Sequence, residues 1–248
     1  MNKVVRASRP QILPTTGAEL ASAISMDEYK RLLGLPRSRD LEGDLLDRAL
    51  SAREWYRNHG DPFVACTTID VKSISSPVVR LSEGTELTSA QLSERLRAGE
   101  AHALVVLVAT AGVAVADKVA GHWAKDRPDE AFFLDRFAVA VTEQLIQWSS
   151  AFLCRASEPS NETLLPHLSP GCGHWDLADQ HRLMALLTND AQLGPLKLLP
   201  SGALHPQHSI IAALGVTHRK FSATPRDICR SCDLDPCAFR RAPFSGSS

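Results

Sequence analysis

Three cysteines near the C-terminus have the clearest capacity for chemistry in this sequence. Cys229, Cys232 and Cys237 form a C-x2-C-x4-C pattern. Two cysteines separated by two residues can turn both sulfur atoms toward one ion, and a third beyond a proline-containing turn can approach the same ion. The pattern favours a metal site, with free thiols or a regulatory disulfide as the alternatives. Arginines that would stabilise thiolates or a negatively charged cluster flank it: Arg226, Arg230, Arg240 and Arg241.

A second candidate segment, residues 168–180, has the sequence LSPGCGHWDLADQ. It combines a rigid proline, two glycines and the start of a helix. Glycine leaves room for the backbone to approach a ligand, so Ser169, Pro170, Gly171 and Gly173 are predicted to bind a cofactor. The alternative is an ordinary tight turn before a helix.

This Ser-Pro-Gly segment, followed by tryptophan and an Asp/Gln pattern, resembles stand-alone proteins related to the activation domain of cobalamin-dependent methionine synthase, which binds S-adenosylmethionine. The order of the shared pieces is kept over roughly residues 25 to 241. The resemblance implies an α+β fold, a single domain whose twisted, mainly antiparallel sheet is flanked by helices. In methionine synthase this domain presents S-adenosylmethionine to the cobalt of a corrinoid domain. The other shared pieces are residues 32–34, 109–112, 135–138 and 205–209.

The chain departs from the donor-binding motif that the resemblance implies. The family's arginine falls on His167, its tyrosine on Cys172 and its glutamate on Val139, so only Gly171 is kept. Carboxylate and guanidinium are the charged anchors for a ligand with an amino acid moiety. Hydrogen bonds to charged groups contribute roughly 1.5 to 3 kcal/mol each. Binding of S-adenosylmethionine is therefore in doubt.

The resemblance also implies a fourth metal ligand. Zinc and iron-sulfur clusters take four ligands, and Cys172 lies in the loop that the family marks as functional. A 4Fe-4S cluster held by Cys172 and the three C-terminal cysteines is preferred over zinc, because the family's setting is redox activation. A histidine could complete a zinc site instead: His167, His174, His205 or His208. Cys66 and Cys154 are interpreted as structural.

Two functions follow. The first is an accessory, reactivation component of a corrinoid-dependent methyltransferase system, such as a split methionine synthase, whose iron-sulfur cluster supports reductive activation of cobalamin. No D-x-H-x-x-G motif is present, so cobalamin would arrive on a corrinoid-binding partner, with an electron donor protein as a further partner. The second is a structural zinc-binding interaction module that kept the fold. A donor-binding enzyme that uses S-adenosylmethionine through Gly171 and nearby backbone is a third possibility.

Composition and missing motifs narrow the class of protein. The 248 residues carry a formal net charge of -1, which argues against bulk neutralisation of nucleic-acid phosphates. The apolar run at 103–116 is too short for an ordinary membrane span, and no signal-type stretch follows Met1, so a cytoplasmic protein is expected. Conventional nucleotide and hydrolase motifs are absent: G-x-G-x-x-G, the P-loop, G-x-S-x-G and H-E-x-x-H.

The elements that must position these residues follow from apolar spacing. We expect an N-terminal arm over 1–24, one domain over 25–241 and a flexible tail over 242–248. Residues 103–110 predict a buried, central strand. Val113, Val115, Val119 and Trp123 are the expected apolar positions of the next helix. Other expected helices cover 26–34, 41–58, 87–97, 130–153 and 176–187, and other expected strands cover 63–71 and 76–81.

Overall fold

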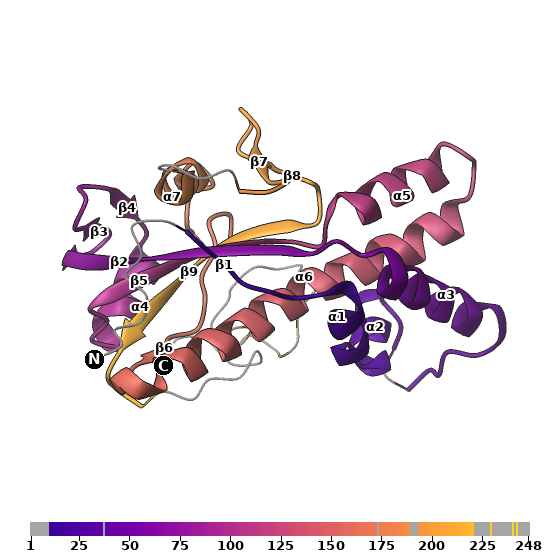
Figure 1. The fold of residues 1–248 in the computed structure, drawn as a ribbon, viewed down its shortest axis with the longest axis horizontal. Coiled ribbons are helices and arrows are strands. Elements are labelled where there is room, and N and C mark those ends of the chain that lie inside the picture. The colour runs from indigo at the N-terminus through magenta and orange to yellow at the C-terminus, as the bar shows by residue number, and fades with distance from the viewer. Residues whose placement is uncertain are drawn as a thin grey trace.

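The computed structural model describes residues 10–36, 38–172, 174–188 and 193–220, with the single residues Cys229, Arg240 and Ala242. Its architecture is α+β, as predicted, with helices on both faces of a sheet (Figure 1). The helices are α1 (Gly17–Ala23), α2 (Met26–Leu32), α3 (Gly43–His59), α4 (Ala90–Ala98), α5 (Val113–Trp123), α6 (Pro128–Ser157), the 3-10 helix η1 (Glu158–Ser160) and α7 (Asp179–Thr188). The strands are β1 (Gln11–Ile12), β2 (Phe63–Ser75), β3 (Val78–Leu81), β4 (Glu86–Thr88), β5 (Ala103–Thr110), β6 (Thr163–Leu164), β7 (Lys197–Leu198), β8 (Leu204–His205) and β9 (Ser209–Thr217).

The pairings of the main sheet are antiparallel. Its strand order is β4-β3-β2-β5-β9-β6, with β1 beside β2, and β7 and β8 form a separate hairpin. β5 lies between β2 and β9, and all eight of its residues are buried. The prediction of a buried central strand at 103–110 is confirmed.

Alternate residues of the central strands enter two separate hydrophobic cores. In β5 the odd-numbered residues 103–109 face the first core, and the even-numbered residues 104–108 face the second. In β9 the even positions 210–216 belong to the first core, whereas Ile211 and Ala213 belong to the second. This alternation is the period of two expected of a strand covered on both faces.

The first core is closed by α1, α2, α3, α5 and α6, of which α6 runs along the sheet in Figure 1. Its centre is an aromatic cluster of Tyr29, Tyr56 and Phe137, with ring centroids 5.1 Å apart for Tyr29 and Phe137 and 5.8 Å for Tyr56 and Phe137. The buried hydroxyls donate to backbone carbonyls, Tyr29 to Phe133 at 2.6 Å and Tyr56 to Ala111 at 2.8 Å. Burial raises the pKa of both phenols, so both remain neutral donors.

The second core lies on the opposite face, under α4, α7 and the loops between β6 and β9. Figure 1 shows α7 and the β7–β8 hairpin on the side of the sheet away from α6. The predicted helix over 87–97 begins at Ala90, because the Ser89 side chain accepts the backbone N–H of Leu92 and caps it. The helix predicted from residue 176 begins at Asp179.

Two expectations about the N-terminal half are wrong. Residues 10–24 are not an extended arm: β1 pairs with β2, and Leu13 and Leu20 are buried in the first core. A capping box of Thr16 and Glu19 starts α1, so the domain extends N-terminal to residue 25. Trp123 was expected in the core but is 57% exposed, because it ends α5 at the surface.

The described helices include none with the combination of length and apolar character that a membrane crossing requires. α6 has 30 residues, and twelve of them are buried in the domain. The buried side chains along α6 pack into the first core. Of the predicted tail, Ala242 is buried, and residues 243–248 lie outside the described residues.

Candidate functional site

A tight turn after β6 displays the thiol of Cys172 at the surface. Leu168 pairs with Ala213 of β9 through two backbone hydrogen bonds of 2.9 and 2.8 Å, which fix the start of the turn to the sheet. The Cys172 N–H donates to the Ser169 carbonyl at 3.1 Å, and Gly171 adopts a φ of +86°, a conformation that favours glycine. Ser169 and Pro170 are buried whereas Cys172 is exposed. The loop thus presents Cys172 from a fixed base.

One buried carboxylate connects this turn to its surroundings. Asp179, 1% exposed, accepts hydrogen bonds from the Trp175 Nε1 at 2.8 Å and from the Thr88 backbone N–H at 2.9 Å. Its other oxygen pairs with the guanidinium of Arg182. Asp179 lies in the first turn of α7, where a negative charge is favourable to the helix dipole, and it also joins the loop to β4.

The β7–β8 hairpin lies next to the Cys172 turn. A Cβ placed on Gly171 would meet the Leu177 side chain at 3.1 Å, and one on Gly202 would meet the same side chain at 3.6 Å. Leu177 therefore lies between the turn and the hairpin. Leu177 and Leu199 are each 42% exposed, so one large apolar side chain faces solvent beside the turn and another does so on the neighbouring hairpin.

The positions of the family's charged anchors do not carry equivalent charges. Val139 lies on α6 and packs against the first core. His167 begins the Ser-Pro-Gly turn, and the guanidinium of Arg95 on α4 lies 3.4 Å from both the Pro166 and the His167 carbonyl oxygens. Burial lowers the pKa of Arg95. A guanidinium does reach the turn, but it comes from α4 and contacts backbone.

A histidine-carboxylate pair lies one helical turn before Val139. His208 Nε2 lies 2.9 Å from Asp135 Oδ1, which joins the segment before β9 to α6. The hydrogen bond from His208 lowers the pKa of Asp135, burial opposes this shift, and the charges of His208 and Arg136 add to the lowering. The backbone carbonyl of His208 accepts from Ala111 N at 2.8 Å, so the pair is fixed at the end of β5. The sequence offered both segments as signs of the resemblance without indicating that they meet.

The remaining cysteines fall into different environments. Cys66 in β2 is buried, and burial raises the pKa of its thiol to about 12, in keeping with a structural residue. Cys154, near the end of α6, is half-buried with its Sγ 3.8 Å from Thr163 Oγ1. Cys229 is half-buried, and Arg240 donates to its carbonyl at 3.0 Å, so one of the flanking arginines contacts the cysteine segment. Cys232, Cys237 and Gly173 lie outside the described residues.

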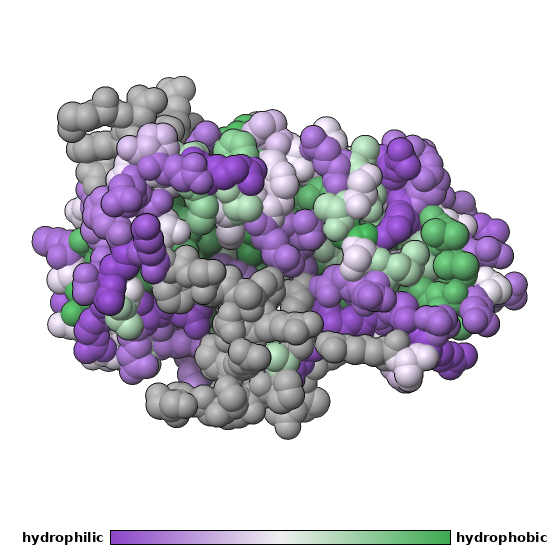
Figure 2. All heavy atoms as spheres, turned by 90° about the horizontal axis from the view of Figure 1, so that it is seen from below, coloured by the Kyte–Doolittle hydropathy of each residue, from purple (hydrophilic) through white to green (hydrophobic). Residues whose placement is uncertain are grey.

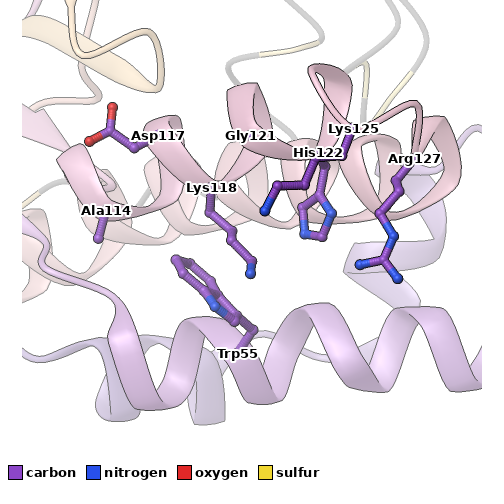
Figure 3. A pocket seen from close by; sticks show the side chains of 8 residues that line it. All are labelled: Trp55, Ala114, Asp117, Lys118, Gly121, His122, Lys125 and Arg127. Carbon is purple, nitrogen blue, oxygen red and sulfur yellow. The ribbon is translucent and has the colours of Figure 1, made fainter.

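A hollow between α3 and α5 was not anticipated from the sequence. It has a volume of about 360 Å³, and Figure 3 shows Lys118 above the ring of Trp55, 5.9 Å from its centroid. Burial and the charge of Lys118 lower the pKa of His122. The basic residues over 118–127 are the feature of the sequence that could have indicated this hollow. Trp55 joins them only because α5 packs on α3. The lining residues are Trp55, Ala114, Asp117, Lys118, Gly121, His122, Lys125 and Arg127.

The resemblance implies two bound groups, S-adenosylmethionine and a metal centre, and the residues present suit them unequally. For S-adenosylmethionine the fit is poor, because Val139 is apolar and the one orphaned polar atom of the turn, the buried Ser169 Oγ, is a single neutral hydroxyl. For a metal centre the donor chemistry fits, because thiolates suit both iron-sulfur clusters and zinc and Cys172 is accessible from solvent.

No protein-family model matches the chain, and no curated protein matches it. Among solved structures, the chain is similar to the crystal structure of the MetH reactivation domain bound to AdoHcy, with a TM-score of 0.64 at 13% sequence identity. The match covers 90% of this chain and 83% of that chain. At this identity the likeness establishes the fold, and it confirms the predicted activation-domain architecture.

Proposed function

We propose that this chain is a reactivation component of a corrinoid-dependent methyltransferase system and acts on cobalamin carried by a partner protein. The observation that carries the proposal is the likeness of 90% of the chain to the MetH reactivation domain. The match covers 90% of this chain and 83% of that chain, so it extends over most of both chains rather than over a small common substructure.

The surface around Cys172 supports docking of a partner. Leu177 and Leu199 expose apolar area beside a turn that Asp179 and β9 hold in place. Apolar side chains that are close together and exposed favour burial against another protein. A corrinoid protein that covers them would also cover Cys172.

Four cysteines would hold the metal centre of this proposal: Cys172, Cys229, Cys232 and Cys237. An iron-sulfur cluster bound there would supply one-electron transfer to the cobalamin of the partner, with an electron donor protein as the source. The chain's own contribution is to hold Cys172 on a rigid turn at the docking surface. Arg240 donates to the backbone carbonyl of Cys229, which ties residue 240 to the segment that carries the C-terminal cysteines.

Under this proposal the chain's role is docking and electron delivery rather than binding of the methyl donor. Val139 and His167 do not supply the charged anchors. The carboxylates one helical turn on either side of Val139, Asp135 and Glu143, are engaged by His208 and Arg31. Calorimetric titration with S-adenosylmethionine is expected to show no heat. A saturable heat would support the alternative of an enzyme that binds S-adenosylmethionine through the backbone at Gly171.

The metal centre is tested on anaerobically purified protein by iron, sulfide and zinc analysis with an absorption spectrum. We expect iron and sulfide with a coloured protein, and we expect Cys172→Ser to lose most of both. The matched control is Cys154→Ser, because Cys154 is a half-buried cysteine on α6 that is assigned no metal role. A colourless protein with stoichiometric zinc would support the alternative, a structural zinc-binding interaction module.

The partner is tested separately with a corrinoid-binding domain of methionine synthase loaded with cobalamin. Pull-down and absorption spectroscopy under reducing conditions should show a complex and a changed cobalt spectrum. The spectral change should be lost in Cys172→Ser and kept in Cys154→Ser. Absence of a complex together with an unchanged cobalt spectrum would contradict the proposed function even if a cluster is present.

A further inference from the structure

Two histidines and a glutamate meet at the end of the sheet where β5 begins and β9 ends. His102 directly precedes β5, Glu162 directly precedes β6, and His218 directly follows β9. One ligand atom from each residue lies within 4.8 Å of the others. None of the three is among the residues that the resemblance marks, and their donors are nitrogen and oxygen rather than sulfur.

The sheet fixes the positions of these residues. The His102 N–H donates to the Val216 carbonyl at 3.0 Å, and the His102 carbonyl accepts the N–H of Val71 at 2.9 Å. Thr163 and Thr217, the neighbours of Glu162 and His218, are directly paired between β6 and β9. The three side chains thus start from three adjacent strands whose register is set by backbone hydrogen bonds.

The hydrogen bonds at the cluster leave metal-binding atoms available. His218 Nδ1 lies 3.2 Å from the Asn161 carbonyl oxygen, so it carries the proton, and the Nε2 lone pair of His218 can bind an ion. His102 Nε2 lies 2.9 Å from Glu162 Oε1. An ion would take the place of the proton that His102 and Glu162 share.

Two buried polar atoms of the cluster have no hydrogen-bond partner within the part of the chain that the structure describes. They are His102 Nδ1 and Glu162 Oε2. Buried polar atoms are ordinarily satisfied. The unsatisfied Glu162 Oε2 belongs to the carboxylate that faces His102 Nε2 and can bind an ion, whereas His102 Nδ1 is the other ring nitrogen and lies away from that contact. The nearest cation along the chain, Arg219, lies 3.1 Å from Glu100 and from the Ala98 carbonyl.

The rings of His102 and His218 are stacked, with centroids 4.7 Å apart and planes 11° from parallel. An ion prefers to lie in the plane of each imidazole that binds it, so one ring must turn. His218 is the exposed member and is the ring that would turn, giving up its stacking on His102, whereas His102 and Glu162 are half-buried. Exposure at His218 also leaves a coordination position open to water.

We propose that His102, Glu162 and His218 form a binding site for a divalent transition-metal ion of the zinc class. Two histidines and a glutamate with a water in the fourth position are a ligand set that zinc accepts with tetrahedral geometry. Its ligands are other residues than the four cysteines, and the proposal does not depend on the proposed corrinoid function. Binding would join the ends of β5, β6 and β9.

The test is titration of the full chain with Co²⁺, because cobalt bound to nitrogen and oxygen lacks the intense sulfur-to-cobalt band that marks thiolate sites. We expect weak d–d bands without that sulfur band, in addition to any thiolate-bound cobalt. His218→Ala and Glu162→Gln should each weaken this component more than about tenfold. The control His181→Ala, which removes an exposed histidine on α7, should bind as the unsubstituted chain does.

A second readout uses the unsubstituted chain, in case a variant fails to fold. Zn²⁺ should protect His102 and His218 from acylation by diethyl pyrocarbonate, measured by mass spectrometry, and should leave His181 reactive. The proposal is overturned if cobalt binds only through sulfur. It is equally overturned if both variants keep full affinity or if zinc protects neither histidine.

Discussion

The two faces of the sheet are covered in different ways. On the first face, α6 and four shorter helices enclose apolar side chains and the three rings of Tyr29, Tyr56 and Phe137. On the second, α4 and α7 share the surface with loops and a hairpin, and the buried carboxylate of Asp179 links them. Loops on a rigid support can change without unfolding the support. We therefore expect the first face to contribute most of the stability, and the docking proposed above uses the second.

The largest effect should come from the aromatic cluster. Phe137→Ala removes a fully buried ring that contacts both tyrosines and should lower the free energy of unfolding by about 3–5 kcal/mol. Urea unfolding followed by circular dichroism measures the change. The control is Phe132→Ala on the same helix, where the ring is 38% exposed and the expected loss is below about 1 kcal/mol. Equal losses would contradict the assignment of stability to the aromatic cluster, because the exposed ring would then contribute as much as the buried one.

A polar substitution on the second face should come next. Asp179→Ala leaves the Trp175 Nε1 and the Thr88 N–H without their acceptor and should cost about 2–4 kcal/mol. The matched control is Asp176→Ala. It removes an exposed carboxylate that accepts the Ala178 N–H, and it should lower the free energy of unfolding by about 1 kcal/mol. Unfolding monitored by tryptophan fluorescence reports both. A neutral Asp179→Ala would show that the turn carrying Cys172 is not held by this carboxylate.

A smaller, pH-dependent effect is expected at the Asp135–His208 pair. The hydrogen bond from His208 lowers the pKa of Asp135 below its ordinary value of 3.8. Such a carboxyl contributes stability above pH 3.8, and the contribution is lost as the pH falls through the lower folded pKa. Asp135→Asn should therefore cost about 1 kcal/mol near neutrality. The difference in free energy of unfolding between the variant and the unsubstituted chain should disappear in acid, as measured by urea unfolding at several pH values. A difference that is constant with pH would contradict the assignment.

The sequence predicts much of the first face because its signals are local. The apolar run of 103–110 and the helical spacing over 130–153 correspond to β5 and α6. α1 was missed because the proline and glycine steps before it indicate irregular chain, although Thr16 and Glu19 form a capping box. The prediction for Trp123 was wrong because helical spacing shows which side of a helix is apolar, but not how far along the helix the rest of the domain covers that side.

The sites were less predictable because their members are far apart in the sequence. The resemblance identified the turn that carries Cys172, and the structure shows that Cys172 is exposed there. Nothing local indicates that Asp135 meets His208, or that His102, Glu162 and His218 gather at one end of the sheet. The packing of α6 on the sheet produces the first contact and strand register produces the second, and both are properties of the whole fold. The grouping of the four cysteines stays a prediction.

The smallest effect on stability should come from the exposed leucines, and it separates folding from docking. Leu177 and Leu50 are 42% and 43% exposed, the first beside the Cys172 turn and the second on α3. Figure 2 shows that apolar area also gathers at the helical end of the molecule, so exposure alone does not identify a docking surface.

Leu177→Ser and Leu50→Ser should each change the free energy of unfolding by less than about 0.5 kcal/mol, because each side chain is already largely in water. Their effects on affinity for the cobalamin-loaded corrinoid domain should differ. Leu177→Ser should weaken the complex by about tenfold, as expected when a central apolar contact is lost, and Leu50→Ser should leave it unchanged. The reverse order would move the docking surface from the second face to the helices of the first, because equal exposure and equal stability leave position as the remaining difference.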